Sequence, residues 1–149
     1  QTDGRVLMTL RRWRTDEAKL ALASASVGIV AHPATESIDP VSDDISRLSL
    51  IALSFPKYTD GRAYSVARRL REAGYKGELR ATGDVLLDQL PLMLRCGFDA
   101  FEITHAATIA ALDRGTLPAV SRVYQSSAAA GSRAWRSRRL PEPRLVAAE

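Results

Sequence analysis

Short apolar runs alternate with segments of helical period along most of the chain. Four runs have the length and composition of buried strands, and each leads into a polar loop: Val27–Ala31, Leu50–Phe55, Glu78–Thr82 and Ala100–Ile103. Between two of them, Gly61–Ala73 carries apolar residues at helical spacing. Strands that alternate with helices are typical of a parallel sheet. We therefore predict an α/β fold, with a mainly parallel sheet of about four strands built from consecutive βα units.

Weaker patterns predict the other elements. Arg5–Leu10 alternates between apolar and polar residues and is expected to be an edge strand. Leu50–Phe55 is apolar on both sides of its alternation, which predicts a central strand covered on both faces. The sheet is expected to be either an open three-layer sandwich or a fragment resembling half a barrel. Four further helices are expected over Asp16–Ala25, Ser42–Ser46, Ala106–Asp113 and Pro118–Ala130.

Pro91 interrupts the helical pattern of Val85–Cys96. Proline lacks a backbone N–H and clashes with the preceding turn, so it is tolerated only in the first turn of a helix. A helix with Asp88 as its N-cap would place Pro91 in that turn, whereas a helix from the start of the pattern would be kinked. We expect the first arrangement, with Gly97 ending the helix.

The composition fits one domain. The chain has 149 residues, of which 46% are hydrophobic and 26% charged, as in ordinary globular domains. We expect one domain over residues 1–130, with its motifs concentrated in residues 49–103. No apolar run approaches the length of a membrane span, and the first residues lack the layout of a signal peptide, so no membrane partner is expected. The single cysteine, Cys96, excludes an internal disulfide and a self-contained iron–sulfur cluster, and fits a reducing cytoplasm.

The charge is concentrated in the tail. The formal net charge is +4, and residues 131–149 form a basic segment that we expect to be flexible. The alternative interpretation is a docking arm for an acidic protein surface. The sequence has no zinc-finger spacing or RNA-recognition signature, so a nucleic-acid partner is not expected. The candidate docking residues of the tail are Arg133, Trp135, Arg136, Arg138 and Arg139.

Three segments resemble a known family in order and spacing: FPKYTDGRAYSVARRLRE, GYKGELRATGDVLLDQ and RCGFDAFEI. The family consists of uncharacterised bacterial proteins that are usually encoded beside siroheme sulfite reductase and are often labelled oxidoreductases of sulfite reduction. The resemblance covers about Val27 to Ile103, and Tyr58 stands where the family has the second aromatic of Phe-Pro-x-Phe. It implies a place in assimilatory sulfate reduction, but it brings no established catalytic residues.

A candidate anion site lies in the loop that follows Leu50–Phe55. Lys57 and Arg62 supply positive charge, Gly61 would allow close approach to the backbone, and Asp60 and Ser65 flank the start of the next helix. The start of a helix presents free N–H groups that suit an anion such as sulfite or phosphate. The loop is therefore a candidate ligand site.

The same residues also have a structural interpretation, in which they order the loop and bind no ligand. Asp60 would cap the helix, and Arg62 would pair with Asp84 or Asp88. Arg80 lies within a predicted strand and Asp84 just beyond it, so we expect the two either to join the ligand site or to form an ion-pair network. All these residues are expected along the edge of the sheet where strands end and helices begin.

The chemistry of the chain leaves open whether it is an enzyme. No GxxxxGK[ST] or GxGxxG motif is present, and no metal site or intrinsic cofactor is expected. We therefore expect an accessory component of sulfite reduction that docks to siroheme sulfite reductase, its electron donor or another sulfate-assimilation protein. The alternative is a small enzyme or sensor that binds an anionic sulfur metabolite. Homo-oligomerisation is compatible with either hypothesis.

Overall fold

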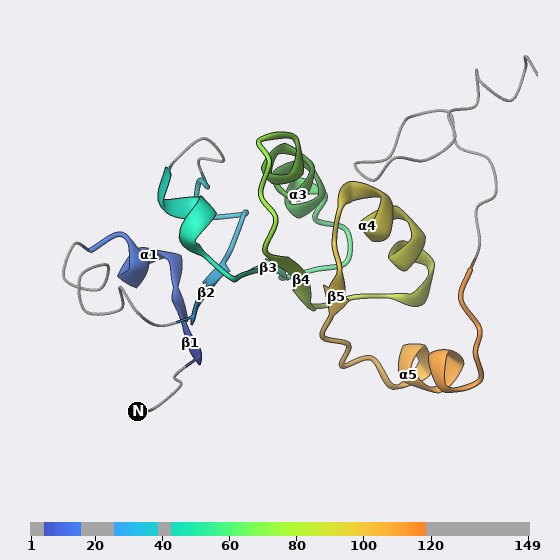
Figure 1. Ribbon diagram of the computed structural model, residues 1–149. Helices are drawn as coiled ribbons and strands as arrows, with labels where there is room; N and C mark the ends of the chain where they lie inside the picture. Colours follow the sequence, from blue (N-terminus) through green and yellow to red (C-terminus); the bar gives the residue numbers. More distant parts are fainter. Residues whose placement is uncertain (1–4, 16–25, 39–42, 119–149) are drawn as a thin grey trace, which may run out of the picture.

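The computed structural model describes residues 5–15, 26–38 and 43–118. These residues form one sheet of five parallel strands, in which the order in space is the order in the sequence (Figure 1). The predicted α/β fold is confirmed, and the weakly alternating N-terminal segment supplies the fifth strand. The strands are β1 (Arg5–Thr9), β2 (Ser26–Ala31), β3 (Leu50–Phe55), β4 (Glu78–Gly83) and β5 (Ala100–Phe101).

The helices and 3-10 turns occupy the connections between strands. Figure 1 shows η1, α3 and α4 on one side of the sheet and α5 on the other side, beyond β5. The helices predicted over 16–25 and over most of 118–130 lie outside the described residues. The helical elements are α1 (Leu10–Trp13), η1 (Asp43–Arg47), α3 (Arg62–Glu72), η2 (Leu87–Gln89), α4 (Leu90–Cys96) and α5 (Ala106–Asp113).

The hydrophobic core lies between the sheet and the elements on its helical side. Alternate residues of the central strands, including Ile29, Ile51, Leu53 and Leu79, are completely buried there. Each such side chain contributes about 1.5–3 kcal/mol relative to an exposed position. At the end of β3 the Phe55 ring packs edge-on against Tyr64 and lies 5.9 Å from the ring of Phe98.

The opposite side of the sheet is an open face. The alternation of strand residues places a second set of side chains there, and Leu7 is 56% exposed. The expectation that β3 is covered on both faces is therefore wrong for the described elements, because sequential right-handed crossovers carry successive helices to one side. The open face consists of Leu7, Thr9, Ser26, Gly28, Val30, Leu50, Ala52, Ser54, Glu78, Arg80, Thr82 and Ala100.

Pro91 lies in the first turn of α4, as predicted. The cap differs from the prediction, because Asp88 lies inside η2 and the helix begins at Leu90. The 3-10 turn lets the chain enter the helix without requiring a proline N–H. Gly97 ends α4 with φ of 102°, a left-handed conformation that favours glycine.

Two other boundaries depart from the sequence prediction. α1 was not predicted; it is a single turn that buries Leu10 and Trp13, and the Thr9 hydroxyl accepts a hydrogen bond from the N–H of Arg12. The strand predicted over Ala100–Ile103 is shorter, since β5 ends at Phe101. Apolar composition alone predicted the longer strand, but pairing with β4 determines where it ends.

Candidate functional site

The loop between β3 and α3 borders a pocket at the edge where the strands end, which we call the carboxyl edge. The pocket has a volume of about 640 Å³ and lies between this loop and the loop that follows β2. It contains five of the seven ligand-site residues that the sequence predicted: Lys57, Asp60, Gly61, Arg62 and Ser65. Its remaining lining residues are Ala34, Pro56 and Thr59.

Arg62 joins the two sides of the pocket. Its Nη1 donates a hydrogen bond of 2.7 Å to the carbonyl oxygen of Ala34. Its Nε lies 3.5 Å from Oδ1 of Asp60, which also accepts a hydrogen bond of 3.1 Å from the backbone N–H of Arg62. Pairing of Arg62 with Asp84 or Asp88, considered from the sequence, is therefore replaced by a local contact with Asp60. The Arg62 side chain is still 63% exposed, so much of it faces solvent beside the pocket.

The carboxylate of Asp84 orders the same loop from the next strand. Its Oδ2 accepts a hydrogen bond of 3.0 Å from the backbone N–H of Tyr58. Nε2 of Gln89 donates a hydrogen bond of 2.6 Å to the carbonyl oxygen of Tyr58. We call this arrangement the Tyr58 clamp. It fixes the main chain while the side chain of Tyr58 is 50% exposed, so the loop presents an aromatic ring from a constrained backbone.

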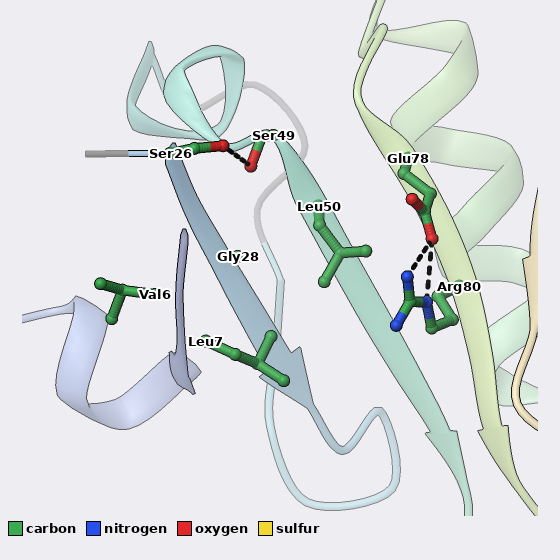
Figure 2. Close-up of a pocket in the computed structure, with 8 residues that line it drawn as sticks. All are labelled: Val6, Leu7, Ser26, Gly28, Ser49, Leu50, Glu78 and Arg80. Atoms are coloured by element: carbon green, nitrogen blue, oxygen red, sulfur yellow. Dashed lines mark hydrogen bonds and ion pairs between the residues drawn. The ribbon is translucent and has the colours of Figure 1, made fainter. Parts of the chain in front are cut away.

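Arg80 lies elsewhere. It extends from the middle of β4 onto the open face, where its Nη2 is 2.7 Å from Oε1 of Glu78 (Figure 2). The sequence placed Arg80 with Asp84 because they are close in the chain. Arg80, however, lies in the middle of β4, whereas Asp84 lies beyond Gly83, the last residue of the strand, and its carboxylate accepts a hydrogen bond from the N–H of Tyr58. The structure therefore brings Lys57, Asp60, Arg62 and Asp84 to the carboxyl edge and separates Arg80 from them.

A family model of bacterial proteins of unknown function (DUF934) matches residues 29–135. The match covers more than two thirds of the chain. The chain belongs to this family. No curated protein matches it.

The family match covers the whole candidate site. It begins within β2 and extends beyond α5, so the pocket and the Tyr58 clamp lie inside it, whereas β1 and α1 lie outside. It also includes Arg133 and Trp135 of the predicted docking tail. These two residues, and Arg136, Arg138 and Arg139 that follow the match, lie outside the described residues.

Tyr58 was absent from the predicted site residues, although the sequence carried a signal for it. It occupies the aromatic position of the Phe-Pro-x-Phe motif to which the sequence was compared. Ala34 was also missed, because it contributes a carbonyl oxygen and no side-chain chemistry to the pocket. The type of a residue does not reveal whether its backbone carbonyl contributes to a site.

Gly61 lies in the pocket without needing the conformational freedom of glycine. Its φ is −82°, and a Cβ at this position would meet nothing within 4 Å. The close approach of a ligand to the backbone, which the sequence suggested, is therefore sterically possible. An alanine would also fit the loop, which makes Gly61 a useful reference position.

Cys96 is a half-buried thiol at the end of α4. Burial raises its pKa, although the positive charges of Arg68 and Arg95 oppose this effect. A raised pKa keeps the sulfur protonated and poorly nucleophilic at neutral pH. The geometry is therefore that of a packed thiol rather than an activated nucleophile.

The described residues contain no group of three or more histidine, cysteine, aspartate or glutamate side chains arranged to hold a metal ion. In the same part of the chain, no helix has the length and apolar character needed to cross a bilayer.

Proposed function

We propose that the protein is an accessory component of assimilatory sulfite reduction in the bacterial cytoplasm, and that it docks on siroheme sulfite reductase or its electron donor. The resemblance of three long segments to the sulfite-reduction family supports the pathway. The observation that carries the docking role is the Tyr58 clamp, which fixes both backbone groups of a residue whose ring is half exposed.

An aromatic ring on an ordered backbone is suited to protein recognition. Tyrosine is enriched among residues that dominate binding energy, and a constrained loop loses little entropy when it binds. Lys57 and Arg62 flank the ring in the sequence and are exposed, so the carboxyl edge favours an acidic partner surface. The arginines between residues 133 and 139 add to the positive charge of the chain.

Purification of the tagged full chain from the bacterium that encodes it tests this function. Siroheme sulfite reductase or its electron donor should be recovered with the wild type and much less with Tyr58→Ala or Lys57→Glu. Lys76→Glu provides a matched control, because Lys76 is also exposed but lies at the edge where β4 begins. The docking function is wrong if no sulfate-assimilation protein is recovered, or if the three variants behave alike.

A second function is supported by the pocket itself. Its volume of about 640 Å³ and the presence of Lys57, Arg62 and Ser65 suit an anionic sulfur metabolite, which would make the protein a small enzyme or sensor. Calorimetry with sulfite, sulfide and adenylylated sulfate distinguishes this function from docking alone. Binding that disappears in Arg62→Ala would favour it, and sulfite-dependent growth that is intact in both Arg62→Ala and Asp84→Ala would exclude it.

A further inference from the structure

The open face has a hollow of about 500 Å³ across β1, β2, β3 and β4. Figure 2 shows the side chains of Leu7 and Leu50 on either side of Gly28, with Glu78 and Arg80 beside them. A Cβ on Gly28 would lie 2.9 Å from Cδ2 of Leu50 and 3.1 Å from Cδ1 of Leu7, so the two leucines occupy the space over the glycine. The result is a continuous apolar strip over three strands.

Parallel sheets are normally covered on both faces, because their strands are apolar on both sides. Here one face packs against helices, while the other exposes 56% of Leu7 and part of Leu50. Exposed apolar strips bordered by charged residues are typical of protein interaction surfaces. The open face therefore has the character of an interface.

The two charged residues of the open face indicate what kind of surface can cover it. Glu78 and Arg80 stand two residues apart on the same face of β4, and their side chains pair at 2.7 Å. The pair carries no net charge and offers both a donor and an acceptor. A partner of one charge sign would meet repulsion from one of the two residues, whereas a surface with the same two residues in reversed order would satisfy both.

We propose that the open face is the interface of a homodimer, and that a second copy of the chain covers it with its own open face. Isologous dimers join identical patches, so residue i of one copy contacts residue j of the other and the reverse. A twofold axis that runs across the strands, between two rows of paired residues, meets this condition. The first row is Leu7, Gly28, Leu50 and Glu78, and the second is Thr9, Val30, Ala52 and Arg80.

This axis places each row against the other row of the second copy. Glu78 then faces Arg80, and Gly28 faces Val30. Leu50 faces Ala52, so large side chains meet small ones along the strip. The two charges exchange partners across the interface, in an environment from which water is excluded and ion pairs are stronger. The interface is separate from the carboxyl edge, so the dimer leaves the Tyr58 clamp accessible and goes beyond the docking function.

Sedimentation equilibrium of the full chain at micromolar concentrations tests the dimer. The wild type should have the mass of two chains. Leu7→Lys places a charge in the apolar strip, and Arg80→Glu gives β4 two acidic residues, so each should weaken dimerisation by about tenfold or more. Leu94→Lys is the matched control, because Leu94 is 42% exposed on α4 and should tolerate the change without effect.

The charge-reversed variant makes the test specific. Glu78→Arg combined with Arg80→Glu restores a self-complementary pair and should return the dissociation constant to near that of the wild type. Circular dichroism checks that each variant folds. If Leu7→Lys does not fold, Arg80→Glu and the charge-reversed double variant test the dimer without it. A monomeric wild type overturns the proposal, whatever else covers the face. So does a dimer that neither Leu7→Lys nor Arg80→Glu weakens, or a charge reversal that fails to restore dimerisation.

Discussion

Gly83 ends β4 in a conformation that only glycine adopts easily. Its φ is +95°, and a Cβ would lie 2.5 Å from the carbonyl oxygen of Phe55 on the neighbouring strand. Gly83→Ala should therefore lower the free energy of unfolding by about 3 kcal/mol, since it combines a strained φ with a backbone clash. Urea unfolding measures the change.

Gly61→Ala is the internal reference for this prediction. Gly61 has an ordinary φ and open space around its Cα, so its substitution should change stability by less than about 0.5 kcal/mol. Equal effects at the two glycines would contradict the steric argument.

Arg71 connects three segments at the edge where the strands begin. Its Nε donates to the carbonyl oxygen of Gly97, and Nη1 donates to the carbonyl oxygens of Tyr75 and Gly77. Nη2 pairs with the carboxylate of Asp99. The Arg71 side chain is only 17% exposed, so loss of its guanidinium would leave several carbonyl oxygens in partly buried positions without their donor.

Arg71→Met should lower the free energy of unfolding by about 3 kcal/mol, because unsatisfied acceptors retain their desolvation cost. Arg71→Lys should recover only part of this loss, since one ammonium group cannot reproduce a planar fork of donors. Arg69→Met, at an exposed position of the same helix, provides the comparison for thermal unfolding measurements. Similar midpoints for Arg71→Met and Arg69→Met would show that the hydrogen bonds contribute little.

At the scale of elements, the β3–α3 loop depends on contacts from the β4–η2 connection. Asp84→Ala removes the acceptor for the N–H of Tyr58, whereas Asp84→Asn keeps a carbonyl oxygen in its place. The alanine variant should increase hydrogen exchange at Tyr58 by about tenfold, for a lost bond of about 1.4 kcal/mol, and the asparagine variant should change it less. Unchanged exchange in the alanine variant would mean that the loop is ordered by other contacts.

The sequence predicted elements well where one physical signal dominated. The largely apolar β3 and the strongly amphipathic α3 were found with nearly the observed bounds. The bounds of β5 and η2 were not predicted. The end of β5 depends on its pairing with β4, and η2 depends on how the chain enters a proline-containing helix. α1 was missed since a single turn has no period to recognise, and its burial of Trp13 comes from tertiary contacts.

The candidate site was predicted in part for a similar reason. Parallel strands bring their following loops to one edge, so Lys57, Arg62 and Asp84 could be grouped from the chain order alone. The partners of Arg62 could not be predicted, because its contacts with Asp60 and with the carbonyl oxygen of Ala34 depend on distances within the fold. Arg80 was misplaced because it lies in the middle of β4 and extends onto the open face, away from the strand end, which proximity in the chain does not reveal.

At the scale of the whole molecule, partly buried Tyr64 and buried Tyr75 make stability sensitive to alkaline pH. Burial raises the pKa of Tyr64 to about 12, with smaller contributions from Cys96 and Asp88. Burial also raises the pKa of Tyr75. The folded state favours the neutral phenol, so this contribution is complete below the ordinary value of 10.0 and is lost as the pH rises from there towards about 12.

The free energy of unfolding should therefore decrease above about pH 10. Tyr64→Phe should make this decrease less steep, since phenylalanine has no ionisable group. Urea unfolding over this pH range measures the slope, and tyrosinate absorbance follows the ionisation directly. A slope that is the same in Tyr64→Phe and the wild type would contradict the assignment.

The strictly sequential strand order has a consequence for how the protein is made. Each of β2, β3, β4 and β5 pairs with the described strand that precedes it in the sequence, so none of them must wait for a later segment before it finds a neighbour. Contacts between segments close in sequence favour fast folding, and domains fold from the N-terminus as they leave the ribosome. The sheet can therefore grow by one βα unit at a time during translation, with each completed unit serving as the template for the next.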